Sequence, residues 1–270
     1  MHIQAFHDNE TGTLTYVVHD PRTLDGIVID SVLDFDPATN QVTERSITAV
    51  VDYLRQNSIR LHGILETHAH ADHLSASQKL KEYFPASKII IGEKIKLVQT
   101  TFAASKTDAS QFDQTLKDFA EVHFGSLHLR ALPTPGHTPA CMSYLIGDAV
   151  FTGDALFMPD AGTGRCDFPQ GSARALYRSV MENIYSLPDA TRIFVGHDYC
   201  PNGRELRFQT TVGESKRSNI HLMSETTEAD YVKFRDERDR TLKEPRLLKQ
   251  SLQVNLEAGK LAPGMTRARD

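Results

Sequence analysis

Residues 66–76, ETHAHADHLSA, place three histidines and one aspartate within six consecutive positions. The residues between these polar side chains are alanines, which leave the imidazole rings room to converge on one point. Imidazole and carboxylate groups are the usual protein ligands of zinc and of iron. An isolated histidine is more often packed or solvated than bound to a metal. Four such groups at this spacing predict a metal site that includes His68, His70, Asp72 and His73.

The cluster lies between a predicted strand and a predicted helix. Residues 61–66, LHGILE, are mostly apolar and predict a strand. Residues 74–84, LSASQKLKEYF, have helical spacing and are followed by Pro85, which ends a helix. The cluster therefore occupies a loop at the C-terminal end of a strand, where α/β proteins concentrate their active sites.

Three further candidate ligands lie in turns beside predicted strands. His137 lies in TPGHT, Asp154 in FTGDA and His197 in VGHDY. A glycine directly precedes each of them, and glycine lets the backbone turn sharply beside a crowded centre. Together with the cluster they give seven potential ligands: His68, His70, Asp72, His73, His137, Asp154 and His197.

The remaining histidines lack such surroundings. The chain has 12 histidines, and we expect surface or structural roles for those outside the ligand set. Among them, His221 in the segment SNIH is the strongest candidate for a further role. The others are His2, His7, His19, His62, His123 and His128.

Strand and helix patterns alternate over the first 200 residues. Residues 43–57 carry apolar side chains at helical spacing, at Ile47, Val50, Val51 and Leu54. Residues 173–185 predict a second helix, and residues 93–125 predict one or two helices with a loop. β-Branched or apolar runs predict the other strands, at residues 13–19, 26–31, 88–92, 127–132, 142–146, 149–152 and 192–195.

The pattern changes near Pro201 to charged, amphipathic helix with no further strands. We therefore predict an α/β fold with mixed sheets over residues 1–200, and a helical C-terminal extension, residues 201–270, packed on the same domain. The residues of the first part carry all seven potential ligands.

Composition narrows the possible partners and location. A net charge of −5 gives no electrostatic reason to expect nucleic acid or an anionic membrane as partner. The first residues, MHIQAFHDNETG, lack the apolar core of a signal peptide, and no apolar run approaches the roughly 18 residues of a membrane span. Cys141, Cys166 and Cys200 lack CxxC spacing and do not suggest a disulfide framework. These features favour a cytoplasmic protein.

The motifs HAHADH, PGHT, GDA and GHDY, in this order, resemble those of the metallo-β-lactamase superfamily over roughly residues 1–200. This resemblance implies an αββα sandwich, in which two mixed sheets are covered by outer helices and the metal site lies at one sheet edge. It leaves two chemistries open. Two zinc ions bridged by Asp154 would activate a hydroxide that attacks an ester, thioester or amide, as in glyoxalase II. One Fe(II) held by two histidines and one carboxylate would leave positions for substrate and O₂, as in persulfide dioxygenases.

Residues 164–171, GRCDFPQG, favour the second chemistry. Arg165, Asp167 and Phe168 resemble the corresponding segment of persulfide dioxygenases, whereas glyoxalase II-like hydrolases tend to have a basic residue, an aromatic residue and a Glu-Gly pair. GHDY and the PAC that follows His137 resemble the same branch. The resemblance thus implies an Fe(II) persulfide dioxygenase. It would oxidise a small thiol persulfide, with glutathione persulfide as the expected substrate, to sulfite and free thiol. The alternative is a two-zinc thioesterase or other metallohydrolase.

The resemblance also implies roles for individual residues. His68, His137 and Asp154 would hold Fe(II), with His70 in or beside this set. Arg165 would bind a substrate carboxylate or hold its loop through Asp167, and Tyr199 would orient substrate or O₂ through its hydroxyl. Cys141 would face the metal or be a small buried thiol. The resemblance also points to a homodimer. The residues that would orient the ligands or hold a second metal are Asp72, His73 and His197.

Two departures from the branch concern the substrate. The segment MPDAGTGR before the arginine is longer than in the mitochondrial-type enzymes, and so are residues 93–125. The C-terminal segments NIHL and LLKQSLQVNLEAGKLAP resemble bacterial dioxygenases associated with sulfide-responsive operons. These differences leave open whether glutathione, coenzyme A or another thiol carries the persulfide.

Overall fold

The computed structural model describes residues 1–268, and its first sheet joins an antiparallel N-terminal half to a parallel half. Hairpin pairing links the first three strands, and helix-containing connections then add three parallel strands. The six strands run in the order β1 (His2–His7), β2 (Leu14–His19), β3 (Asp25–Ile29), β6 (Arg60–Leu65), β8 (Lys88–Gly92) and β9 (Gln114–Leu116).

The second sheet also has six strands, and they lie side by side in sequence order. All its pairs are antiparallel except the parallel pair of β13 with β14. The strands are β10 (Glu121–Phe124), β11 (Leu127–Pro133), β12 (Met142–Ile146), β13 (Ala149–Phe151), β14 (Arg192–Phe194) and β15 (Gln209–Thr211). A small sheet has the order β16 (Thr266–Arg267), β5 (Gln41–Thr43), β4 (Val32–Asp36) and β7 (Leu74–Ser75).

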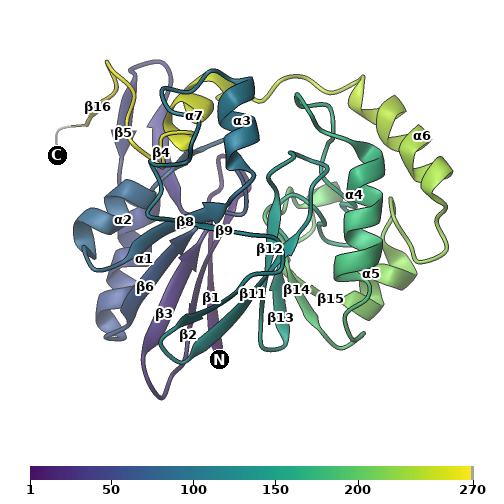
Figure 1. Ribbon diagram of the computed structural model, residues 1–270, viewed down its shortest axis with the longest axis horizontal. Helices are drawn as coiled ribbons and strands as arrows, with labels where there is room; N and C mark the ends of the chain where they lie inside the picture. The colour runs from purple at the N-terminus through teal and green to yellow at the C-terminus, as the bar shows by residue number, and fades with distance from the viewer. Residues whose placement is uncertain (269–270) are drawn as a thin grey trace.

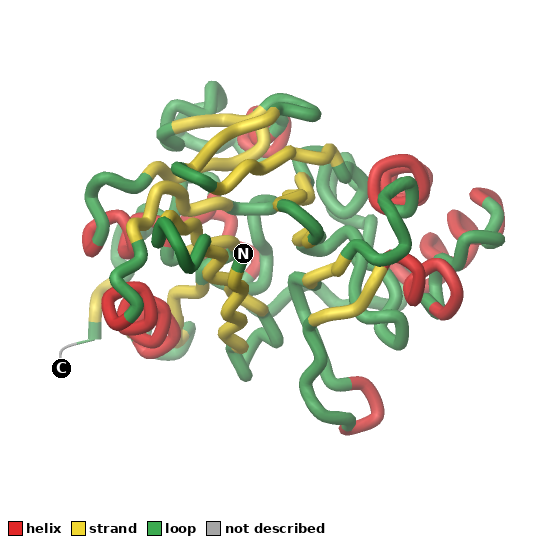
Figure 2. The backbone as a smooth tube through the Cα atoms, turned by 90° about the horizontal axis from the view of Figure 1, so that it is seen from below, coloured by secondary structure: helices red, strands yellow, loops and turns green. Residues whose placement is uncertain are grey.

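Helices cover the outer faces of the two large sheets. In Figure 1, α1 and α2 lie beside the first sheet and α4 and α5 beside the second. Figure 2 shows the same arrangement from below, with strands at the centre and helices toward the periphery. No helix among residues 1–268 is long and apolar enough to cross a membrane. The helices are α1 (Arg45–Gln56), α2 (Ser77–Tyr83), α3 (Ile95–Thr101), α4 (Ala173–Ser179), α5 (Val212–Ser218), α6 (Glu228–Asp239) and α7 (Leu248–Asn255), with a π-helical turn at Val180–Ile184 and a 3₁₀ turn at Pro201–Gly203.

Burial of apolar side chains explains the layers. Tyr16, Ile27 and Leu65 of the first sheet pack in one buried cluster with Tyr144 and Phe151 of the second, so the inner faces form the main core. The four apolar positions that predicted the first helix are all buried in a second cluster, between α1 and the outer face of the first sheet. The strands β2, β3 and β8 bury nearly every residue and are therefore mostly apolar runs, whereas β11 alternates buried and exposed residues over its first half. The predicted αββα architecture is confirmed.

Several local predictions were wrong. Residues 93–125 contain α3 and also the strands β9 and β10, and the C-terminal part contains β15 and β16 as well as helices. The predicted helix at residues 74–84 begins at Ser77, because Leu74 and Ser75 pair with β4. The strands β1, β4 and β5 were also not predicted. Most of these strands have two to five residues and are defined by pairing with distant segments, which leaves little local pattern.

Candidate metal centre

Four connections bring the predicted ligands together at one end of the two large sheets. The loop of residues 66–73, hereafter the cluster loop, follows β6. His137 lies between β11 and β12, Asp154 follows β13, and His197 follows β14. The parallel strands β13 and β14 therefore deliver two ligands side by side, since equivalent ends of parallel neighbours meet at one edge.

The predicted glycine turns are present at these ligands. Gly153 has φ +50° and Gly136 has φ +150°. Residues with a side chain rarely adopt these values. A Cβ atom at Gly153 would collide with the Thr67 side chain, and one at Gly136 would collide with Leu176. The absence of a side chain is therefore what lets the segment of Asp154 approach the cluster loop.

His68, His137 and Asp154 form one group of potential metal ligands. Their ligand atoms all lie within 4.8 Å of one another. Asp154 Oδ2 lies 3.6 Å from His137 Nε2 and 4.0 Å from His68 Nε2. His68 Nε2 and Asp154 Oδ1 are buried and have no hydrogen-bond partner among the described residues. Buried polar atoms are rarely left unpaired, so these unpartnered atoms and the donor chemistry fit a bound metal.

Hydrogen bonds at Nδ1 orient both imidazoles of this group, with their Nε2 atoms toward Asp154. His137 Nδ1 lies 2.7 Å from the Arg165 carbonyl oxygen, which only accepts, so Nδ1 carries the proton and Nε2 keeps its lone pair. Thr67 Oγ1 donates to Asp30 Oδ2 at 2.8 Å and accepts from His68 Nδ1 at 3.0 Å. Burial and the neighbouring imidazoles lower the pKa of His68, which keeps this ring neutral.

His70 lies beside this group, and its ring centroid is 4.1 Å from that of His68. Its Nε2 lies 3.0 Å from Asp30 Oδ1 and 3.3 Å from Glu66 Oε2, rather than facing Asp154. Burial opposes protonation of His70, but the two carboxylates outweigh it and raise its pKa well above the usual value. Its Nδ1 is buried without a hydrogen-bond partner among residues 1–268, so His70 could bind a metal through this nitrogen.

A second group of ligands adjoins the first. His70, Asp72 and His73 have ligand atoms within 4.8 Å of one another. His197 Nε2 lies 3.3 Å from Asp154 Oδ1 and 3.7 Å from Asp72 Oδ2. Asp154 therefore directs one oxygen toward His68 and His137 and the other toward His197, which is the placement that a bridging carboxylate needs. The geometry accommodates one metal or two.

Sequence reasoning missed the residues that hold the cluster loop. Asp30 follows β3 with φ +52° and bonds Thr67 and His70, and Thr13 lies beside His73 and His197. Asp30 could have been found, because it is a polar residue directly after a predicted strand, like the recognised ligands. Glu66 accepts from Ser75 at 2.6 Å and also from Ser77.

The role of Asn255 was also not predicted from the sequence. It lies at the end of α7, and its side-chain amide donates to the carbonyl oxygens of His70 at 2.8 Å and His73 at 2.9 Å. Its Oδ1 accepts from the backbone N–H of Ser75 at 2.8 Å. No local signal marks this asparagine, because its contacts join segments about 180 residues apart.

Residues 162–168, hereafter the arginine loop, form the opposite wall. Arg165 makes a bidentate ion pair with Asp167 at 2.6 Å, donates to the Lys243 carbonyl at 2.7 Å, and lies over the Phe168 ring at 5.2 Å. The structure thus agrees with the second of the two roles considered for Arg165, holding the loop through Asp167. Its guanidinium also faces the cavity described below.

Helix α6 supports the arginine loop from behind. The buried Asp239 accepts from the Cys166 backbone N–H at 2.8 Å, and its partner Arg235 donates to the Thr163 carbonyl at 3.1 Å. His221 Nδ1 accepts from the Thr163 backbone N–H at 3.0 Å. His221 therefore has a structural role, supporting the loop rather than the metal.

A cavity of about 300 Å³ opens beside the first ligand group. Tyr199 lies on its wall, 62% exposed, with its ring stacked on His197 at 5.5 Å and an interplanar angle of 4°. Its position is compatible with the predicted contact to substrate. The cavity is lined by Glu10, Thr11, Ala71, Asp72, His137, Asp154, Arg165, Phe168, Tyr199, Pro245 and Arg246.

The cysteines lie outside the ligand set. Burial raises the pKa of the Cys141 thiol to about 12, and its sulfur accepts a hydrogen bond from the Thr138 backbone N–H and also contacts the Thr138 hydroxyl at 3.1 Å. Cys141 therefore remains a protonated, structural thiol at neutral pH. All three cysteines are free, as their spacing suggested.

In the comparison with known proteins, one domain family matches this chain. The profile described as "Metallo-beta-lactamase superfamily" matches residues 9–197, which include all seven predicted ligands. Among solved structures, "Crystal structure of ETHE1 from Myxococcus xanthus" has a TM-score of 0.79 and 29% sequence identity, and the match covers 96% of this chain and 100% of that one.

The names of similar proteins refer to two kinds of chemistry, hydrolysis and persulfide oxidation. "Glyoxylase B2" of Dictyostelium discoideum is 43% identical, over 97% of this chain and 92% of its own length. "Beta-lactamase hydrolase-like protein" of Agrobacterium fabrum is 45% identical over 96% of this chain, which spans only 61% of that longer protein. "Persulfide dioxygenase ETHE1, mitochondrial" of Bos taurus is 30% identical, over 97% of this chain and 90% of its own length.

Proposed function

This chain belongs to the metallo-β-lactamase superfamily, and from that premise we propose that it is a persulfide dioxygenase. The reaction converts a small thiol persulfide, O₂ and water into sulfite, the free thiol and two protons. The terminal sulfur is oxidised and leaves the thiol sulfur, while O₂ is reduced. The resemblance to persulfide dioxygenases seen in the sequence is confirmed by relatives that carry this name and by the ETHE1 structure.

The convergence of His68, His137 and Asp154 is the observation that carries the proposal. Two imidazoles and one carboxylate on one side of a metal are the ligand set of non-haem Fe(II) oxygenases. His70 Nε2 contacts the carboxylates of Asp30 and Glu66, so this nitrogen is not part of the ligand group. Bound Fe(II) would supply the electron chemistry with O₂.

The chain itself provides orientation and charge. The carbonyl of Arg165 and the hydroxyl of Thr67 fix the ring orientations of His137 and His68. Arg165 and Arg246 line the cavity, where they would attract the carboxylates of a substrate such as glutathione persulfide. The half-buried Phe168 and the exposed Tyr199 line the same cavity, where they would contact the substrate.

A dinuclear zinc thioesterase is the second candidate. It is favoured by the second ligand group and by the placement of Asp154 between both groups. It is also favoured by the hydrolase-type names of two relatives that are more than 40% identical to this chain. Two bound zinc ions would supply a hydroxide nucleophile for a thioester carbonyl.

One assay separates the two candidates. Anaerobically purified protein is supplied with glutathione persulfide while O₂ uptake and sulfite are measured, and with S-lactoylglutathione while hydrolysis is measured. Stoichiometric O₂ uptake and sulfite formation with no hydrolysis would support the dioxygenase. Thioester hydrolysis without O₂ uptake would refute it in favour of the second candidate.

Other expectations remain predictions of the proposal. They are glutathione as the carrier of the persulfide, a homodimer, a cytoplasmic location, and no nucleic-acid or membrane partner. The division into a catalytic part, residues 1–200, and a C-terminal extension also stays a prediction. The hydrogen bonds of Asn255 to the cluster loop mean that the two parts would form one functional unit.

A further inference from the structure

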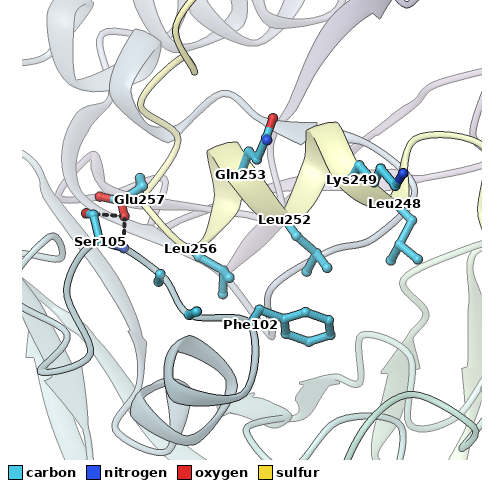
Figure 3. A pocket seen from close by; sticks show the side chains of 10 residues that line it. Phe102, Ser105, Leu248, Lys249, Leu252, Gln253, Leu256 and Glu257 are labelled. Atoms are coloured by element: carbon cyan, nitrogen blue, oxygen red, sulfur yellow. Dashed lines mark hydrogen bonds between the residues drawn. The ribbon is translucent and has the colours of Figure 1, made fainter.

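An apolar groove lies between α7 and residues 102–105, which directly follow α3. Figure 3 shows that Leu248 and Leu252 of α7, and Leu256 directly after it, point from one side toward Phe102. Their spacing of four residues places them in a single stripe. The groove has a volume of about 480 Å³, and Ser105 and Glu257 join its two walls by a hydrogen bond of 2.5 Å at one end.

A small hollow, here called the neck, shares lining residues with this groove and with the cavity of the metal centre. It has a volume of about 20 Å³, close to the space that holds one water-sized molecule. Phe102, Leu248 and Leu252 line both the groove and the neck. At the other end, Ala71, His137 and Phe168 line both the neck and the cavity of the metal centre. The groove therefore shares wall residues with the neck, and the neck shares others with the cavity of the metal centre.

The walls of the neck are almost entirely apolar. Besides the shared residues, they are formed by Ala69, Val98, Thr138, Pro139 and Pro169. The neck has no charged side chain except the potential charge of His137, whose Nδ1 is already bonded to the Arg165 carbonyl. Apolar cavities of this kind stay dry and accept apolar atoms or small molecules.

We propose that the groove and neck form an entry path for O₂, separate from the cavity that takes the persulfide. This inference rests on the proposed dioxygenase function. O₂ is small and apolar, so it fits a neck that is closed to a thiol persulfide by size and to ions by the cost of leaving water. The charged cavity, lined by Arg165, Arg246 and Glu10, matches the other substrate.

Two separate entrances have a functional consequence. A persulfide bound in the cavity covers the approach past Tyr199 and Arg165, yet O₂ still reaches the ligand group from the side of Ala71 and His137. The two substrates therefore need not bind in a fixed order. The alanines of the cluster loop gain a second role, because a larger side chain at Ala69 or Ala71 would fill the neck.

Xenon binding tests the path without depending on catalysis. Crystals of the wild-type protein under xenon pressure are expected to show xenon in the neck, between Val98, Leu252 and the His137 ring. Leu252→Trp should remove this xenon, whereas Gln250→Trp, on the same helix but lining neither hollow, should keep it. An empty neck in wild-type crystals would overturn the path.

Kinetics at varied O₂ give the second measurement. Leu252→Trp and the independent neck variant Val98→Phe are expected to raise KM for O₂ several-fold while KM for the persulfide and kcat at saturating O₂ stay unchanged. Unchanged KM for O₂ in both folded variants, with an active wild type, would refute the path alone. A rise only in KM for the persulfide would assign the groove to the thiol substrate instead. A wild type that consumes no O₂ would refute the proposed function and the O₂ path with it, even if xenon binds.

Discussion

The cluster loop and the arginine loop face each other across the metal centre, but they are built differently. The cluster loop supplies ligand side chains and is held by two buried residues from outside it, Asp30, which bonds Thr67 and His70, and Asn255. The arginine loop supplies one backbone carbonyl to His137 and is held from behind by α6. Its side chains line the cavity instead of completing the ligand set.

This difference separates two tasks. Damage to the cluster loop should release the metal, because the ligands and their buried partners act together. Damage to the arginine loop should leave the metal in place and change how substrate binds.

Asp154→Ala should have the largest effect. It removes the carboxylate that lies between both ligand groups, so the purified protein should contain no stoichiometric metal and lose activity entirely. Metal content by mass spectrometry and O₂ uptake are the measurements. Asp167→Ala, in the arginine loop, is the matched control and should retain the metal. Equal metal loss in both variants would show that the two loops are not separable.

Asn255→Ala should be the next most damaging change. It leaves one buried N–H and two buried carbonyl oxygens of the cluster loop region unpaired, which costs roughly 4 kcal/mol of folding free energy at ~1–3 kcal/mol for each group. Metal affinity should also fall by about 10–100-fold, as for other groups that orient ligands. Chemical denaturation and metal titration measure these effects.

Ser251→Ala is the control for this change. Ser251 is buried on the same helix, but its hydroxyl has no hydrogen-bond partner within residues 1–268. Its removal should leave stability unchanged or slightly increased. An Asn255 variant as stable and as well metallated as the Ser251 variant would contradict the account of the cluster loop.

The support of the arginine loop should depend on pH through His221. Burial lowers the pKa of His221 to about 4, from 6.5 in an unfolded chain. The unfolded chain therefore takes up a proton first as the pH falls. The contribution of His221 to stability is fully present above about pH 6.5 and declines toward pH 4, by up to about 3 kcal/mol.

His221→Asn tests this dependence. An asparagine oxygen can still accept from the Thr163 backbone N–H, but it does not titrate in this range. Unfolding free energies measured from pH 7 to pH 4 should fall less steeply in the variant than in the wild type. Parallel curves for the two proteins would show that His221 does not act in this way.

Much of the site could be predicted from sequence because its ligands come directly after strands. His68, Asp154 and His197 all follow strands that were correctly predicted, and neighbouring strand ends converge by the geometry of the sheets. His70 was predicted to be in or beside the iron ligands, but its Nε2 contacts Asp30 and Glu66. The sequence could not indicate which nitrogen of that ring faces the metal.

The supporting residues were harder to predict for a physical reason. Asn255 and Asp239 act on loops that lie far away in the sequence, and their roles arise only when α6 and α7 pack on the body of the protein. Strand β15 is similar, since its three residues are defined by antiparallel pairing with β14. Such contacts leave no periodicity in the sequence around them.

Arg165→Ala should have the smallest effect of the series. The metal should remain, and KM for the persulfide should rise about tenfold, equivalent to about 1.4 kcal/mol, because the cavity loses a cation and the ion pair with Asp167. Arg174→Ala removes an exposed arginine paired with Glu228 outside the cavity and should leave KM unchanged. Loss of all iron from the Arg165 variant would show that its role has been assigned wrongly.

We propose that one metal ion, held by His68, His137 and Asp154, is sufficient for activity. The most direct test is the number of metal ions per chain in anaerobically purified wild type and in Asp72→Ala. Asp72 belongs only to the second ligand group. We predict one iron per chain in both proteins. Two metals in the wild type, with one lost from Asp72→Ala, would contradict the account and favour the dinuclear hydrolase.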